Sequence, residues 1–281
     1  MNRMSGTARW RGSPPTEHAD LRAARRVKTA WPVAVAMVLA AAAAGCGGSD
    51  EMPGTAASTS TTGPSPTSLD GCITADDAKL MRFPGSRGEI SAAVFGDGEV
   101  GVVVSNTLIG RVCDWLPWAE ELAALDYRVM LFNYSSPMPV TDIPTAVETY
   151  TADTVEAAVK LRELGVEKLV LVGGSAGALS VLGAGLVDRT GADGVVSLSA
   201  AGSTEVTESV GRLELPVLLV AARDDFPAFE MADELYRAAE NAESRKLLIL
   251  DGALHADMLL RPDAPTRPQV EQEILAFLQA L

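Results

Sequence analysis

Histidine and cysteine are both scarce in this chain, which has two histidines and three cysteines among 281 residues. Zinc sites in proteins take three or four ligands, most of them from these two residue types. One histidine, His18, lies close to the N-terminus and the other is His255. The sequence therefore predicts no metal site.

Basic residues are also few, with 23 Lys and Arg against 37 Asp and Glu. The first 45 residues hold seven of the basic and two of the acidic residues, so the remainder carries 16 basic and 35 acidic ones. Affinity for nucleic acid depends on Lys and Arg that neutralise phosphates, and binding to anionic lipid depends on the same charges. We expect no nucleic-acid partner and a soluble, self-repelling surface.

No apolar run is long enough to span a bilayer, which takes roughly 20 residues. The apolar run 33–44 follows a basic segment and is typical of the core of a signal peptide. It ends in Ala43-Ala44-Gly45-Cys46, which resembles a bacterial lipobox with Ala43 in place of the usual Leu. The resemblance implies cleavage before Cys46, lipidation of this cysteine and anchoring at the outer face of the cell membrane. An ordinary secretory signal, with Cys46 a free thiol, is the alternative.

The segment after Cys46 is rich in Gly, Ser, Thr and Pro and is too poor in apolar residues to repay the entropy of ordering. We predict a signal segment over 1–45, a flexible tether over 46–70 and a folded domain over 71–281. If Cys46 is lipidated, Cys72 and Cys113 remain as a pair. In an oxidising compartment they predict one disulfide, with two buried thiols as the alternative.

From about residue 80, runs rich in β-branched residues alternate with segments that have apolar residues at helical spacing. Several of the runs are continuously apolar, as in strands buried on both faces of a parallel sheet. The alternation predicts an α/β fold, a doubly wound and mostly parallel sheet with helices on both faces. The predicted strands are 90–95, 100–105, 127–133, 168–172, 194–198, 215–221 and 246–250. The predicted helices are 114–125, 143–164, 176–187, 227–240 and 268–281.

One predicted strand leads into Gly173-Gly174-Ser175-Ala176-Gly177, a G-x-S-x-G pattern that opens a predicted helix. This is the context of a nucleophile elbow, a sharp turn that presents a serine at a helix N-terminus. The serine excludes a dinucleotide-binding G-x-G-x-x-G loop, and no Lys follows as a phosphate-binding P-loop requires. We therefore expect no cofactor. Ser175 could instead be an ordinary helix N-cap.

His255 follows the predicted strand 246–250 and is the only histidine outside the signal segment. A serine needs an adjacent base to become a nucleophile, and ligands gather at the carboxyl ends of the strands in open α/β sheets. We expect His255 to be that base. The carboxylate that orients the imidazole should follow another strand, which points to Asp225, with Asp224 as the alternative; Asp251 and Asp257 are further candidates.

The order Ser175, Asp225, His255, with each residue placed after a predicted strand, resembles the α/β-hydrolase superfamily from about residue 85 onward. The segments 102–106, 115–129 and 217–225 are similar to small bacterial hydrolases of the dienelactone-hydrolase and esterase type. Many relatives have His-Gly after the first of these strands, where this chain has Asn106-Thr107. The resemblance implies an oxyanion hole formed by the N–H groups of Ala176 and Leu108. We also expect at most a minimal lid, because the longest stretch between core elements, 133–144, is short.

These residues together predict a serine hydrolase that cleaves an ester or related acyl bond of a small-molecule substrate through an acyl-enzyme. Two alternatives stay open. The same triad could perform amidase, peptidase or acyltransferase chemistry, and the domain could be a binding lipoprotein without activity on a hydrolase scaffold.

Overall fold

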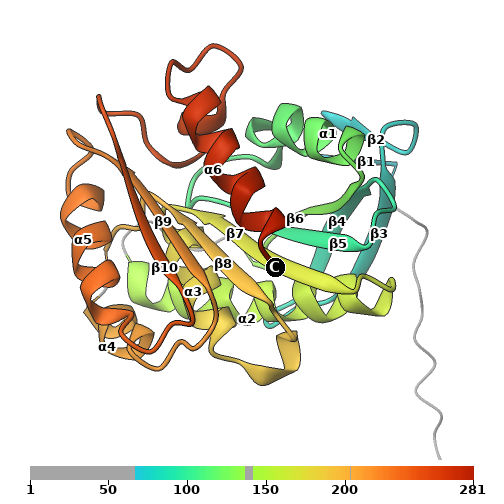
Figure 1. The fold of residues 1–281 in the computed structure, drawn as a ribbon. Helices are drawn as coiled ribbons and strands as arrows, with labels where there is room; N and C mark the ends of the chain where they lie inside the picture. The colour runs from blue at the N-terminus through green and yellow to red at the C-terminus, as the bar shows by residue number, and fades with distance from the viewer. Residues whose placement is uncertain (1–66, 137–141, 203) are drawn as a thin grey trace, which may run out of the picture. The chain divides into compact units, whose positions relative to one another are not determined.

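The computed structural model describes residues 67–136, 142–202 and 204–281. The predicted signal segment, Cys46 and most of the predicted tether lie outside the described residues. Strands and helices alternate along the chain (Figure 1). The strands are β1 Ser68–Leu69, β2 Ile73–Thr74, β3 Lys79–Pro84, β4 Glu89–Phe95, β5 Val100–Ser105, β6 Tyr127–Asn133, β7 Lys168–Gly174, β8 Gly194–Leu198, β9 Val217–Ala222 and β10 Arg245–Leu250. The helices are η1 Val112–Asp114, α1 Leu116–Ala124, α2 Ile143–Glu163, α3 Ala176–Gly185, η2 Asp188–Thr190, α4 Thr204–Val210, α5 Ala228–Ala238, η3 Ala256–Leu260 and α6 Arg267–Gln279.

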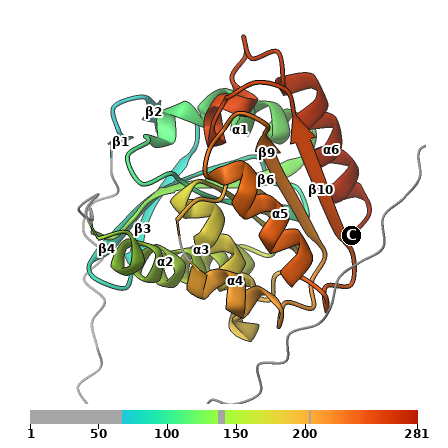
Figure 2. The same ribbon diagram turned by 90° about the vertical axis from the view of Figure 1, so that its left-hand side faces the viewer.

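Eight of these strands form one sheet in the order β10-β9-β8-β7-β5-β6-β4-β3. The strands from β10 to β6 are parallel, whereas β4 and β3 pair antiparallel at one edge. Helices α1 and α6 pack on one face, and α2, α3 and α5 on the other (Figures 1 and 2). This is the doubly wound, mostly parallel sheet that the sequence predicts.

The central strands are buried on both faces because their side chains are apolar without alternation. β9, for example, is buried along its whole length, and Leu169 and Leu171 of β7 are fully buried. Each such side chain contributes about 1.5–3 kcal/mol on burial. The two resulting cores lie on opposite faces of the sheet and hold the loops at its carboxyl edge on a rigid base.

The N-terminal part of the domain differs from the sequence prediction. The sequence pattern does not predict β3, because it is an edge strand in which charged residues such as Lys79 and Arg82 interrupt the buried Leu80 and Phe83. Ser68 and Leu69 pair with β2, and Leu69 is buried among apolar side chains of the domain. The strand β1 therefore lies within the segment 46–70 that the sequence predicts as tether. The sequence pattern also does not predict the short helix α4.

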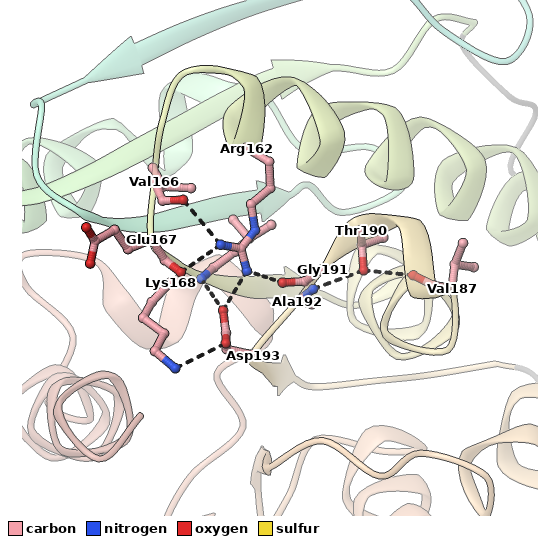
Figure 3. A network of polar contacts seen from close by, with 10 residues as sticks. Arg162, Val166, Glu167, Lys168, Val187, Thr190, Gly191, Ala192 and Asp193 are labelled. Atoms are coloured by element: carbon pink, nitrogen blue, oxygen red, sulfur yellow. Dashed lines mark hydrogen bonds and ion pairs between the residues drawn. The ribbon is translucent and has the colours of Figure 1, made fainter.

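A polar network joins the amino-terminal edge of the sheet to the end of α2 (Figure 3). The Arg162 guanidinium donates to the Glu167 carbonyl at 2.8 Å and to the Asp193 carboxylate at 2.7 Å. The same carboxylate accepts the Leu169 N–H at 2.8 Å. The network fixes the starts of β7 and β8, at the opposite end of these strands from Ser175. Among the described residues, no helix is both long and apolar enough to cross a membrane.

Candidate active site

Ser175 occupies the turn between β7 and α3, in a strained backbone conformation with φ 56° and ψ −116°. Its N–H donates to the Leu198 carbonyl at 2.9 Å, which ties the turn to the neighbouring strand β8. A Cβ on Gly173 would clash with the carbonyl of Gly177, so the turn requires glycine there. Strain of this kind persists only where the surroundings enforce it, and it concentrates at functional sites.

The side chain of Ser175 does not cap α3, although the residue stands at the N-cap position. The helix-cap alternative for this serine therefore does not hold in the structure. The half-buried residue sits at the N-terminus of a helix of ten residues, Ala176–Gly185. The unpaired N–H groups and the dipole of such a terminus favour negative charge.

His255 and Asp225 are paired at the same edge of the sheet. The imidazole Nδ1 lies 2.8 Å and 3.0 Å from the two carboxylate oxygens of Asp225. The carboxylate is buried, with 9 % of its side chain exposed, while the imidazole is 31 % exposed. This pairing leaves Nε2 free of the carboxylate, as the base of a hydrolytic triad requires.

The backbone hydrogen bonds of this edge explain why Asp225, rather than Asp224, meets the histidine. The Asp224 N–H donates to the Gly252 carbonyl at 2.9 Å, so the chain after β9 follows the chain after β10. The Asp225 N–H then turns back to the Ala222 carbonyl at 3.2 Å. As a result the Asp225 side chain is buried and that of Asp224 is exposed.

The other two candidate carboxylates have different partners. Asp251 is fully exposed, at 3.8 Å from Arg223. Asp257 is buried and lies 3.2 Å from the guanidinium of Arg261. Burial raises the pKa of Asp257, and the nearby charge of Asp114 raises it further. In the structure, Asp225 is thus the candidate that contacts the imidazole.

The Ser175 turn and the His255 loop are in contact through their neighbouring residues. A Cβ placed on Gly174 would lie 2.9 Å from the Cβ of Ala256, and these two residues adjoin Ser175 and His255. β5, β7, β9 and β10 are parallel, so the loops that carry the candidate residues all leave the same edge of the sheet.

The loop after β5 lies against the first turn of α3. A Cβ on Gly177 would clash with the carbonyls of Ser105 and Asn106, so α3 and this loop approach as closely as backbones allow. The resemblance places the oxyanion donors, the N–H groups of Ala176 and Leu108, on these two segments. Hydrogen bonds made by the side chains of Asn106 and Thr107 hold this loop. In the sequence these two residues stand out only because many relatives have His-Gly in their place.

Two cavities lie near helix α2. One of about 300 Å³ adjoins the loop after β5 and is lined by loop residues together with Asn133, Tyr134 and Tyr150. The other, of about 520 Å³, lies between α2, α3 and α4 and is lined by none of the candidate catalytic residues. Within the described residues, no group of three or more His, Cys, Asp or Glu side chains is arranged to hold a metal ion.

The Cys72–Cys113 disulfide predicted by the sequence is present, with Cα atoms 6.0 Å apart. It joins the β1–β2 hairpin to η1, which follows the loop of residues 106–111. We expect the double variant Cys72→Ser/Cys113→Ser to lose about 2–4 kcal/mol of unfolding free energy, because the bond no longer restricts the unfolded chain. Urea unfolding followed by circular dichroism measures this loss. An unchanged unfolding midpoint would contradict the expectation.

Comparison with known proteins gives likeness of structure only. No family model matches the sequence, and no curated protein sequence matches it. Esterase 2 of Thermogutta terrifontis, phosphonylated by cyclosarin, superimposes with a TM-score of 0.59 at 14% identity, over 75% of this chain and 97% of that one. A putative dienelactone hydrolase of Klebsiella pneumoniae gives a TM-score of 0.58 at 15% identity, over 73% and 98%. Dienelactone hydrolase of Anabaena variabilis gives 0.56 at 17% identity, over 73% and 98%. The described residues therefore have the α/β-hydrolase fold.

Proposed function

We propose that this protein is a serine hydrolase that cleaves carboxylic esters through an acyl-enzyme formed on Ser175. The observation that carries the proposal is the pair of His255 with the buried carboxylate of Asp225, which stands beside a strained serine turn at a helix N-terminus. A serine, an imidazole and an orienting carboxylate form the set of groups that nucleophilic acyl transfer requires. The esterases and dienelactone hydrolases among the similar structures support an ester as the substrate.

Each proposed residue has a defined role in the reaction. Ser175 Oγ attacks the ester carbonyl while His255 Nε2 takes its proton, and Asp225 holds Nδ1–H and stabilises the imidazolium. The oxyanion that forms faces the N–H groups of Ala176 and Leu108. The tetrahedral intermediate collapses to an acyl-enzyme, and the alcohol leaves with the proton from His255. Water then attacks the acyl-enzyme with the same base, which releases the carboxylic acid and restores Ser175.

A panel of chromogenic substrates tests this proposal. The purified protein is assayed with p-nitrophenyl acetate, butyrate and octanoate and with the p-nitroanilide of the preferred acyl group, with Ser175→Ala as the blank. We expect hydrolysis of at least one ester well above the blank, at a higher kcat/KM than that of the anilide. A faster reaction of the anilide would indicate an amidase or peptidase. Folded protein that hydrolyses no ester above the blank would indicate a binding protein.

We further propose that the domain is exported and held at the membrane by lipid on Cys46. The support is in the sequence, where a signal-like segment ends in Ala-Ala-Gly-Cys and a Gly/Ser/Thr/Pro-rich stretch follows. Fractionation of cells that express the full chain tests it. We expect wild-type protein in the membrane fraction and Cys46→Ser in the soluble fraction, because a single lipid modification site is removed. Equal membrane association of both proteins would contradict the anchor.

A further inference from the structure

Asn106 is a buried amide at the end of β5, with 5 % of the residue exposed. Its Nδ2 donates to the Gly110 carbonyl at 2.7 Å. Its Oδ1 accepts the indole N–H of Trp115 at 2.8 Å and the backbone N–H of Thr107 at 2.7 Å. One side chain thus closes the loop of residues 106–110 on itself and ties it to Trp115.

The hydrogen bonds made by Asn106 and Thr107 determine which backbone N–H groups of the loop can donate to an acceptor outside it. The Thr107 N–H is taken by Asn106, and the Gly110 N–H donates to Thr107 Oγ1 at 2.8 Å. Between them lie Leu108 and Ile109, and neither N–H donates a hydrogen bond within the part of the chain that the structure describes. The Ile109 residue is 81 % exposed, whereas Leu108 is half-buried.

Trp115 connects this loop to the nucleophile turn. Its indole is buried, and a Cβ on Gly174 would lie 2.9 Å from the ring atom Cζ2. The indole therefore touches the residue before Ser175 with its ring and holds Asn106 with its N–H. A shift of the Asn106 side chain would alter the position of the loop relative to the serine turn.

Tyr134 holds the backbone of Asn106 from the other side. Its hydroxyl lies 2.7 Å from the Asn106 carbonyl. Its ring stacks on Tyr150, with centroids 3.5 Å apart and planes inclined by 2°. Burial raises the pKa of Tyr134 above the usual value for a tyrosine, so at neutral pH its hydroxyl is protonated and can donate this hydrogen bond.

We propose that Asn106 is a positioning residue, whose amide fixes the loop of residues 106–110 so that the Leu108 N–H faces the oxyanion formed at Ser175. This inference rests on the proposed hydrolase function, because the loop has this role only if Ser175 attacks a carbonyl. The proposed role of Asn106 explains how the loop can present an oxyanion donor although this chain lacks the His-Gly found in many relatives. An oxyanion donor acts on charge that develops in the transition state and not on the bound substrate.

The test combines steady-state kinetics with a transition-state analogue. Asn106→Ala is assayed on the preferred p-nitrophenyl ester, and the inhibition constant of a trifluoromethyl ketone with the same acyl group is measured. The ketone adds to the serine and places an oxyanion in the hole. We expect kcat to fall by about 10- to 100-fold with KM changed by less than about threefold. We expect the affinity for the ketone to fall by the same factor as kcat/KM.

Thr190→Ala is the matched control. Thr190 is buried in η2, donates to the Val187 carbonyl at 2.9 Å and accepts the Ala192 N–H at 3.2 Å. It belongs to the network at the opposite end of the sheet (Figure 3). We expect this variant to lower the melting temperature and to leave kcat, KM and the affinity for the ketone within about twofold of wild type.

Trp115→Phe provides a second variant if Asn106→Ala does not fold. It removes the N–H that holds Asn106 and keeps an aromatic ring at this position, although the smaller ring loses part of the packing of the indole against Gly174. We expect a fall in kcat and in affinity for the ketone with little change in KM, the same pattern as for Asn106→Ala. An Asn106→Ala or Trp115→Phe protein that is folded and keeps wild-type kcat and affinity for the ketone would overturn the inference. Wild-type protein that hydrolyses no ester and binds no ketone would instead overturn the proposed function.

Discussion

His255→Ala is expected to lower kcat for ester hydrolysis by about 10⁵- to 10⁶-fold. In the structure His255 is the imidazole beside the Ser175 turn, and without it the hydroxyl has no base to take its proton. The residual activity should match that of Ser175→Ala, because residues that act as one unit are not additive. Initial rates of wild type and variants on the preferred p-nitrophenyl ester measure the loss.

Asp251→Asn is the control for the His255 loop. Asp251 precedes His255 on the same connection after β10, and its side chain is fully exposed. We expect Asp251→Asn to keep kcat within about twofold of wild type. His255→Ala must also retain the wild-type circular dichroism spectrum. A folded His255→Ala protein with more than a tenth of the wild-type kcat would show that His255 is not the base.

Asp225→Asn is expected to lower kcat by about 10³- to 10⁴-fold with little change in KM. The amide nearly preserves the shape of the side chain, but it no longer holds the Nδ1–H tautomer or stabilises the imidazolium. Asp224→Asn serves as the matched control, because the two residues are adjacent and the side chain of Asp224 is exposed. We expect this control to stay within about threefold of wild type. A larger loss in Asp224→Asn than in Asp225→Asn would reverse the assignment.

The sequence predicts the fold correctly where a continuous run of apolar residues forms a strand that is buried on both faces. Strands such as β5, β7 and β9 are continuous apolar runs, and they are buried on both faces. Glycine on either side of Ser175 fits the close approach of β7 and α3. The edge strand β3 escapes prediction because its buried Leu80 and Phe83 alternate with exposed Lys79 and Arg82.

The choice between Asp225 and Asp224 depends on a single turn of the backbone. Both residues follow β9, and composition does not separate them. The hydrogen bond from the Asp224 N–H to the Gly252 carbonyl decides which carboxylate turns inward. That bond joins two connections 28 positions apart in the chain, a distance at which no local pattern is informative.

The network around Asn106 is likewise a product of tertiary structure. Asn106 and Trp115 are nine residues apart, and Tyr134 lies 28 residues from Asn106. No local pattern gives Trp115 a functional role, and the resemblance marks Asn106 only as a departure from His-Gly. Their hydrogen bond becomes apparent only when β5, α1 and β6 are packed together.

The site of reaction with a fluorophosphonate tests the central claim most directly. The purified, folded protein is treated with the probe, and the modified peptide is identified by mass spectrometry, with Ser175→Ala and heat-unfolded protein as controls. We expect a single adduct on Ser175 in the folded wild type and none in either control, because only the assembled triad activates this hydroxyl. Folded wild-type protein that stays unlabelled while a reference esterase reacts, or that carries the adduct on another residue, would contradict the assignment of Ser175 as the nucleophile.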